Sequence, residues 1–381
     1  MKKQLLMTPG PTPIPQEVYQ ALIQQVVHHR TEAFTPYFRE AIDLLKKFFK
    51  TEKRVYVFSA SGTGAMEAAV VNAVAPGEKA IFAVCGRFSE RFYKIATAYG
   101  VDAVRVDVPW GEPFPPELLE KSLKEHPDAK AVFAIFNETS TGVYNDVKSY
   151  GEIVSKTDAL LVVDGVSGIG AMPFYFDEWK IDIAVTGAQK AMMMPPGLAA
   201  VAVSDRAFER SQKVNSPRFY WDFKLYEDAM NRKNPETPFT PPISMIYAMY
   251  AGLKKLVEEE GLENAWERHA RLAEATREAV KALGLELFPK ANYSNSVTAV
   301  VLPEGVPDAE LRKLMKEKSI IIAGGQAHLK GKIIRIGHLG YVVDTDVLAT
   351  VAALEVSLKQ VGYQVELGRG VVAAQKVLYS L

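Results

Sequence analysis

Short apolar runs alternate with amphipathic segments between residues 54 and 204. Several of these runs, such as AKAVFAIF and ALLVVD, lack the alternation of apolar and polar residues that a half-exposed strand has. Unbroken apolar runs of this length are typical of strands covered on both faces of a sheet. The pattern predicts seven strands, at residues 54–58, 79–86, 102–108, 129–137, 159–165, 181–187 and 197–204.

Segments with helical periodicity separate the first five predicted strands. Examples are MEAAVVNAV, SERFYKIATAYG and ELLEKSLKEH. A strand, a helix and a second strand in succession form a parallel pair. The order therefore predicts an α/β fold whose mostly parallel, seven-stranded sheet is sandwiched by helices.

This alternation stops after the seventh strand, and we expect the Pro-rich residues 205–242 to be irregular. The elements predicted beyond them are helices at 243–261, 264–284, 308–319 and 345–360 and strands at 296–302 and 332–337. We therefore expect a large domain over residues 15–255. A smaller C-terminal α+β domain is expected over 256–381, together with the N-terminal segment 1–14.

Composition narrows the class of protein. Lys plus Arg and Asp plus Glu number 45 each, so no net charge points to nucleic acid or an acidic membrane as a partner. The single cysteine, Cys85, excludes an internal disulfide framework and a Cys-rich metal site. No run of about 18 apolar residues is present, and the N-terminus does not read as a signal peptide. We expect a soluble, cytoplasmic protein without a metal.

In an open parallel sheet, ligands bind beyond the carboxyl ends of the strands. The first strand is followed by SASGTGAMEAA, in which small residues open a helix. Free backbone N–H groups at Ser61, Gly62 and Thr63 could hold a phosphate there, although the same letters also suit a plain strand-to-helix turn. The segment matches neither GxxxxGK[ST] nor GxGxxG, so neither nucleotide motif applies.

Two further strand ends carry charged residues. Lys190 is the only ionisable side chain between residues 183 and 204, and Asp164 ends the run ALLVVD. Taken singly, Asp164 could be a turn or N-cap residue, and Lys190 could reach solvent along its stem. Taken together with the phosphate turn, they fit pyridoxal 5'-phosphate. In that interpretation Lys190 forms the Schiff base and Asp164 keeps the pyridine nitrogen protonated.

Nine segments then carry a family resemblance that runs nearly the length of the chain. They are TPGPTPIP (8–15), HHRTEAF (28–34), SASGTGAMEAA (59–69), CGRFSERF (85–92), NETSTG (137–142), VVDGVSGIGA (162–171), TGAQKAMMMPPGLA (186–199), TPFTPP (237–242) and RIGHLG (335–340). In this order the chain resembles the class V aminotransferases of pyridoxal phosphate fold type I. Within them it is most similar to the alanine/serine–glyoxylate or –pyruvate group.

The resemblance implies roles for particular residues. The phosphate is implied to bind Ser61, Gly62, Thr63 and Gln189, and, across a homodimer interface, the partner's Thr237 and Thr240. Around the ring it implies Phe88 stacking on one face, Val166 packing on the ring, Thr139 near the phenolic oxygen, Asp164 at the ring nitrogen and Lys190 as the Schiff-base lysine. On the substrate side it implies Arg335 at the carboxylate, a role that a planar guanidinium suits. Gly10 is implied to let the backbone approach the substrate.

The reaction expected from the resemblance is ping-pong transamination through a Schiff base, between alanine or serine and glyoxylate or pyruvate. Phosphoserine aminotransferase is the alternative, because His29, Arg30, His328 and Lys330 could form a second anion site. A lyase or cysteine desulfurase of the same fold would need a mobile cysteine, whereas Cys85 has small and apolar neighbours. A non-catalytic subunit would have little use for the pair Lys190 and Asp164. The sequence assigns no role to the tail 361–381.

Overall fold

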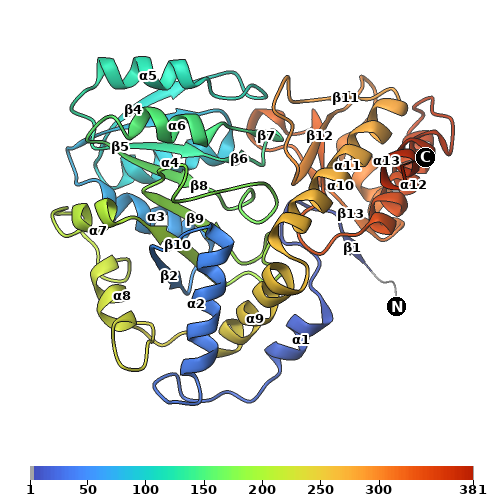
Figure 1. Ribbon diagram of the computed structural model, residues 1–381. Helices are drawn as coiled ribbons and strands as arrows, with labels where there is room; N and C mark the ends of the chain where they lie inside the picture. The colour runs from blue at the N-terminus through green and yellow to red at the C-terminus, as the bar shows by residue number, and fades with distance from the viewer. Residues whose placement is uncertain (1–3, 381) are drawn as a thin grey trace.

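A seven-stranded sheet forms the centre of the larger part of the chain in the computed structural model, which describes residues 4–380 (Figure 1). Residues 1–3 of the predicted N-terminal segment and residue 381 of the tail lie outside the described residues. The strand order is β2-β10-β9-β8-β5-β3-β4. The strands are β2 (Arg54–Phe58), β3 (Lys79–Val84), β4 (Asp102–Asp107), β5 (Ala131–Ile135), β8 (Leu160–Asp164), β9 (Ile183–Gly187) and β10 (Ala199–Val203).

The sheet is mostly parallel, as predicted, and each strand lies within the residues predicted for it. Only β10 runs antiparallel to its two neighbours, β2 and β9. Every residue of β5, β8, β9 and β10 is buried, which explains why these runs are unbroken in the sequence. The edge strand β4 instead alternates between exposed and half-buried positions.

Helices cover both faces of this sheet (Figure 1). Because successive residues of a strand point to opposite faces, Val132 and Phe133 of β5 enter two different hydrophobic clusters. One cluster includes α2 (Thr35–Phe49), α5 (Pro116–Glu125), α6 (Val147–Val154) and α9 (Ile243–Lys254). The other includes α3 (Gly62–Ala73) and α4 (Arg87–Ala98). The core of the large sheet therefore has two layers of side chains.

The prediction that residues 205–242 are irregular is wrong in part. Two short helices lie in this segment, α7 (Asp205–Ser211) and α8 (Phe223–Met230). Each begins after a polar cap, since the side chain of Ser204 accepts from the N–H of Ala207 and that of Asp222 accepts from the N–H of Lys224. In α8, Phe223 is also buried in the cluster that contains α3. Capping and burial together override the Pro-rich composition.

A four-stranded sheet of order β11-β12-β15-β14 lies beside the large one (Figure 1). Its strands are β11 (Glu286–Leu287), β12 (Val297–Val301), β14 (Ala323–Gly324) and β15 (Ile333–Gly337), and it packs with α10 (Leu262–Ala282), α11 (Asp308–Glu317), α12 (Asp344–Gln360) and α13 (Arg369–Leu378). The π-helical turn Lys255–Glu259 links α9 to α10, where the domain boundary was predicted. The division into two domains stays a prediction.

The start of the chain joins the smaller part of the structure. Strand β1 (Leu5–Leu6) pairs in parallel with β13 (Ile320–Ile321), and the N–H of Gly337 donates to the carbonyl of Met7 at 2.8 Å. The remaining elements are α1 (Gln16–Leu22), the hairpin of β6 (Asn137–Glu138) and β7 (Val143–Tyr144), and a 3-10 turn at Ala327–Leu329. Among residues 4–380, no helix has both the length and the apolar composition that crossing a bilayer requires.

We predict that Asn72→Ala lowers the free energy of unfolding by about 1–3 kcal/mol, because the substitution leaves buried backbone groups without a hydrogen-bond partner. The buried Asn72 side chain donates to the carbonyl of Trp221 at 2.7 Å and accepts from the N–H of Phe223 at 3.2 Å, tying α3 to the start of α8. Urea denaturation measures the loss. The exposed Asn231, substituted by Ala, is the control, and equal stabilities of the two variants would contradict the prediction.

Candidate active site

A cavity of about 240 Å³ opens beyond the carboxyl ends of β2, β5, β8 and β9. This is the edge at which open parallel sheets bind ligands. Its lining consists of Ser61, Gly62, Thr63, Met66, Phe88, Arg91, Ile135, Asn137, Thr139, Asp164, Val166, Ser167, Gln189 and Lys190. This lining includes every residue that the resemblance implies at the cofactor, apart from the two threonines expected from a partner chain. Arg91, Asn137 and Ser167 are lining residues that the sequence reasoning missed.

Lys190 enters the cavity from the turn after β9. Its ammonium nitrogen donates to the carbonyl of Pro9 at 2.5 Å, and no carboxylate of residues 4–380 lies within ion-pair distance of it. Burial lowers the pKa of Lys190 to about 8, against the opposing effect of the nearby negative charge of Asp164. The amine therefore carries a substantial neutral fraction near pH 7–8, which an ordinary lysine does not. A neutral amine is a nucleophile.

Asp164 is the last residue of β8 and is 3% exposed. Burial raises the pKa of its carboxyl to about 6, while the N–H of Val166, which donates to it at 2.9 Å, works in the other direction. The positive charges of Arg91 and Lys190 also favour the ionised form. Asp164 therefore presents a buried anion at pH 7, suited to a partner that carries a proton.

The start of α3 forms the cradle that the sequence predicted. Ser61 is its N-cap residue, with extended backbone and no hydrogen bond from its side chain to the helix. The N–H groups of Gly62 and Thr63 are thus available to an anion, whereas that of Gly64 donates to the carbonyl of Ser61. A Cβ on Gly62 would lie 2.8 Å from Val166, so only glycine fits this approach. Beside the cradle, the buried Oε1 of Gln189 has no hydrogen-bond partner.

Phe88 lies at the start of α4, held by a buried carboxylate. Glu138 is fully buried and accepts from the backbone N–H groups of Phe88 and Ser89, the latter at 2.9 Å. The hydroxyl of Ser140 also donates to Glu138, at 2.6 Å. A carboxylate at a helix N-terminus is stabilised by the free N–H groups and the helix dipole. Glu138 lies in the segment NETSTG, but the sequence alone did not predict that it binds the start of α4.

Arg335 extends from β15 toward the cavity without lining it. Its Nη1 donates to the carbonyl of Thr139 at 3.0 Å and its Nε to that of Gly324 at 2.9 Å. The side chain is 5% exposed, and burial lowers its pKa to about 10, so it remains a cation at neutral pH. Among the residues that the structure describes, no carboxylate forms an ion pair with it. A buried, unpaired guanidinium is suited to binding an incoming carboxylate.

Gly10 lies against Lys190 in the segment that follows β1. A Cβ at this position would lie 2.4 Å from Nζ of Lys190, and the backbone φ of 133° disfavours other residues. Nearby, the hydroxyl of Thr12 donates to the carbonyl of Lys190 at 3.1 Å. The N-terminal segment therefore forms one wall beside the amine.

Comparison with known proteins identifies the family of the chain. The family model for Aminotransferase class-V matches residues 5–343. The chain belongs to the class V aminotransferases. An uncharacterised aminotransferase of Methanocaldococcus jannaschii is 44% identical over 99% of this chain and 98% of its own length. A serine–glyoxylate aminotransferase of Methylorubrum extorquens is 38% identical over 98% of this chain and 95% of its own length.

A solved structure confirms the predicted fold class. The ureidoglycine–glyoxylate aminotransferase of Bacillus subtilis has a TM-score of 0.94 and 32% identity, covering 100% of this chain and 99% of its own. The family resemblance stated from the sequence is confirmed as well. The roles of the individual site residues stay predictions.

Several predicted residues of this aminotransferase lie outside the cavity. Thr237 is buried and donates to the carbonyl of Phe239 at 2.6 Å, while Thr240 is exposed. The four candidates for a second anion site also lie apart from the cavity lining: His29 and Arg30 lie beside Glu236, and His328 and Lys330 are exposed. The Arg30 guanidinium is already 3.2 Å from a carboxylate oxygen of Glu236.

Cys85 is a packed residue of the aminotransferase core. It is fully buried, and burial raises the pKa of its thiol to about 12. The amide of Asn145 donates to its sulfur at 3.4 Å. A thiol with this pKa is not ionised near neutral pH and is a poor nucleophile. The position therefore offers no mobile catalytic cysteine.

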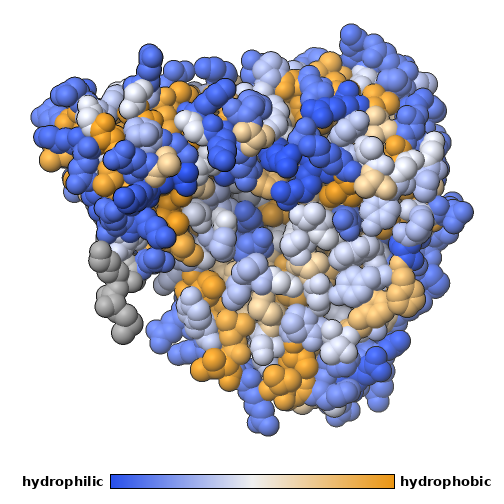
Figure 2. All heavy atoms as spheres, turned by 180° about the vertical axis from the view of Figure 1, so that it is seen from behind, coloured by the Kyte–Doolittle hydropathy of each residue, from blue (hydrophilic) through white to orange (hydrophobic). Residues whose placement is uncertain are grey.

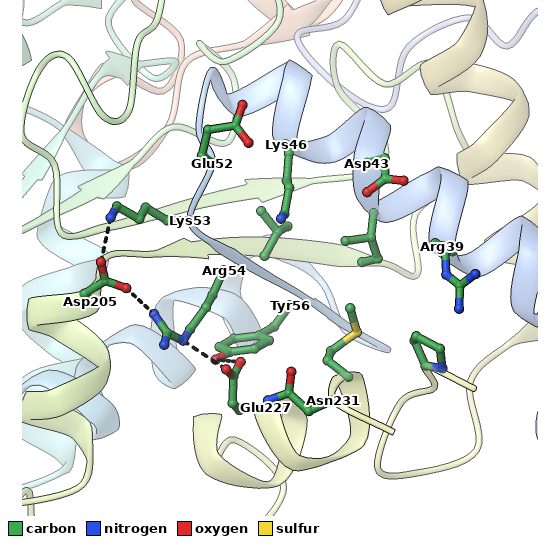
Figure 3. Close-up of a pocket in the computed structure, with 14 residues that line it drawn as sticks. Arg39, Asp43, Lys46, Glu52, Lys53, Arg54, Tyr56, Asp205, Glu227 and Asn231 are labelled. Atoms are coloured by element: carbon green, nitrogen blue, oxygen red, sulfur yellow. Dashed lines mark hydrogen bonds and ion pairs between the residues drawn. The ribbon is translucent and has the colours of Figure 1, made fainter. Parts of the chain in front are cut away.

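A larger cavity of about 440 Å³ lies at the opposite end of β2, between α2 and α8 (Figure 3). Four of the charged residues that line it bond to one another. Lys53 and Arg54 both bond Asp205, and Glu227 accepts from Arg54 at 3.1 Å and from the hydroxyl of Tyr56 at 2.9 Å. It lies at the amino end of its strand, where parallel sheets do not bind ligands. We place the chemistry in the smaller cavity.

We predict that Gly10→Ala lowers transaminase activity by about 100-fold, since an added methyl group must displace Nζ of Lys190 and a shift of about 1 Å at a reacting group has effects of this size. Steady-state kinetics measure the loss. Gly305→Ala is the matched control, because Gly305 also has a positive φ, of 84°, but has no atom within 4 Å of an added Cβ. Similar activities of the two variants would contradict the prediction.

Proposed function

We propose that the protein is a pyridoxal 5'-phosphate-dependent aminotransferase that moves an amino group between alanine or serine and glyoxylate or pyruvate. The observation that carries the proposal is the meeting of Lys190 and Asp164 in one cavity, the first with a lowered and the second with a raised pKa. Opposed shifts of this kind are typical of groups that act on a bound ligand.

The residues present fit the cofactor. Two buried side-chain oxygens of the lining, Oε1 of Gln189 and Oδ1 of Asn137, have no hydrogen-bond partner. Buried polar atoms are rarely left unpaired, so these two favour a polar ligand in the cavity. The start of α3 offers free N–H groups to a phosphate, and Asp164 offers an anion to a protonated ring nitrogen. Phe88 and Val166 supply apolar surface for a flat ring.

Each residue would then have a distinct task. Pyridoxal phosphate, when bound, supplies an aldehyde that captures amines and a ring that accepts electron density. Lys190 would hold the cofactor through its amine nitrogen and would carry a proton at the substrate α-carbon. Asp164 would keep a proton on the ring nitrogen. Arg335 would bind the substrate carboxylate and so orient the α-carbon.

Small substrates suit this site better than phosphorylated ones. Arg335 is a buried guanidinium next to the cavity that forms no ion pair within residues 4–380, and it can bind a single carboxylate. The relatives named above from Methylorubrum extorquens and Bacillus subtilis both carry glyoxylate in their names. For phosphoserine aminotransferase, a second anion site would be needed, and Arg30 is already engaged by Glu236.

We further propose a cytoplasmic homodimer that completes its sites across the interface. Thr240 is exposed and lies outside the cavity of its own chain, as expected if it reaches the phosphate of a partner, whereas Thr237 is buried against its own chain. The region of α1 exposes large hydrophobic side chains, Tyr19, Ile23 and Val26, with Ile23 85% exposed. Figure 2 shows hydrophobic side chains gathered on the lower part of the molecule, where α1 lies in Figure 1. Burial in a dimer would cover such a surface.

We predict that Lys190→Ala keeps the fold but lowers turnover by about 100- to 10,000-fold, because the nucleophile and proton carrier is lost. In addition, borohydride reduction should no longer attach the cofactor covalently to the chain. Mass spectrometry measures this as the absence of the added cofactor mass. The exposed Lys121, substituted by Ala, is the control. Wild-type turnover in Lys190→Ala would refute the assignment, and a colourless wild-type protein that takes up no cofactor would refute the proposed function.

The substrate class is tested by comparing two reactions. We predict that kcat/KM for serine or alanine with glyoxylate or pyruvate exceeds that for glutamate with phosphohydroxypyruvate. His328→Ala and Arg30→Ala should leave the favoured reaction unchanged, since neither residue lines the cavity. A higher kcat/KM for the phosphorylated acceptor, lost in these two variants, would instead support phosphoserine aminotransferase.

A further inference from the structure

Arg91 is a cationic residue of the cavity lining that has no place in the function proposed above. It lies on α4, three residues after Phe88, so the two side chains share a face of the helix. Its guanidinium lies 4.7 Å from the centroid of the Phe88 ring, within the range of a cation–π interaction. Its Nη1 donates to the hydroxyl oxygen of Thr63 at 3.0 Å. Arg91 thus connects the ring at the start of α4 to the cradle at the start of α3.

The charge of Arg91 is left uncompensated by carboxylates. Its neighbours Arg87, Lys94 and Arg105 all form ion pairs with Glu90. For Arg91 no ion pair exists among residues 4–380. An unpaired guanidinium next to a cavity favours an anion inside it.

The hydrogen bond to Thr63 has a directional consequence. A hydroxyl group has one hydrogen to donate and lone pairs to accept with. Because the Thr63 oxygen accepts from Arg91, its own hydrogen is free to donate elsewhere, and the first turn of α3 lies beside it. A donor that is itself hydrogen-bonded to a cation is polarised and binds an anion more strongly.

We propose that Arg91 is a positioning residue for the cofactor phosphate: stacked on the Phe88 ring, its guanidinium fixes the Thr63 hydroxyl as a hydrogen-bond donor to the phosphate oxygens. This inference rests on the proposed function, because it assumes that the anion in the cradle is the phosphate of pyridoxal phosphate. Among the described residues, Arg91 contacts the Phe88 ring and the Thr63 hydroxyl, and it makes no hydrogen bond to Lys190.

The electrostatics of the cavity agree with this arrangement. The positive charge of Arg91 favours the ionised form of Asp164 and the neutral form of Lys190, and these are the two forms that the proposed chemistry requires. Removing the charge should therefore raise the pKa of the Lys190 amine. The pH at which the apo-protein captures the cofactor at half its maximal rate should rise in consequence.

The test compares two ligands that differ by the phosphate. Pyridoxal phosphate and unphosphorylated pyridoxal are titrated into apo-protein, and Kd is read from the visible absorbance. In Arg91→Gln we expect Kd for pyridoxal phosphate to rise about tenfold or more, the size of a lost hydrogen-bond network to a charged group. Kd for pyridoxal should stay within about threefold, and Arg91→Lys should recover part of the loss. Arg87→Gln removes the same charge from the same helix and should change neither Kd.

A double-mutant cycle with Thr63→Val decides whether Arg91 acts through the hydroxyl. If it does, Arg91→Gln has little further effect on pyridoxal phosphate binding in the Thr63→Val background. An undiminished effect there, an equal loss for both ligands, or equal behaviour of the Arg91→Gln and Arg87→Gln variants would overturn the inference. If Arg91→Gln fails to fold, the same comparisons with Arg91→Lys decide. A wild-type protein that binds neither ligand would refute the proposed function instead.

Discussion

The burial of one amine is the constraint on which the rest of the site depends. Lys190 lies in the turn after β9, half-buried in the wall of the cavity, with a backbone carbonyl rather than a carboxylate as its hydrogen-bond acceptor. A carboxylate in that place would hold the proton on the amine, whereas a neutral carbonyl lets burial lower the pKa. Asp164 is close enough to be felt electrostatically, yet it is hydrogen-bonded to Val166 instead. The sheet supplies the geometry by ending β8 and β9 side by side.

Buried charges elsewhere in the site are balanced through helix ends and backbone groups rather than through direct ion pairs. Glu138 accepts from the first N–H groups of α4, and Arg335 donates to two carbonyls. Glu138 supports the positive charge of Arg335 electrostatically without forming an ion pair with it. Neutral partners stabilise these charges while leaving Arg335 free to pair with a substrate.

The sequence predicted the sheet because its central strands are apolar on both faces. A short, unbroken apolar run such as AVFAI is typical of a strand that is buried on both faces of a sheet. It also located the cavity, because charged or small residues at strand ends in an α/β fold converge on one edge. Arg91 and Glu138 could not be found in this way. Their roles depend on contacts between segments that are far apart in the chain, Thr63 with Arg91 and Glu138 with Phe88. Helix α8 was missed because the surrounding segment is Pro-rich, while its burial against β2, which adds to the cap at Asp222, depends on residues far away in the chain.

Strand β15 is attached to both sides of the reaction centre. Arg335 projects from its middle, while Gly337 at its end holds the carbonyl of Met7, two residues before the Pro9 carbonyl that accepts from Lys190. The Arg335 guanidinium and the backbone that accepts from Lys190 are therefore anchored to the same buried strand, and not to separate loops.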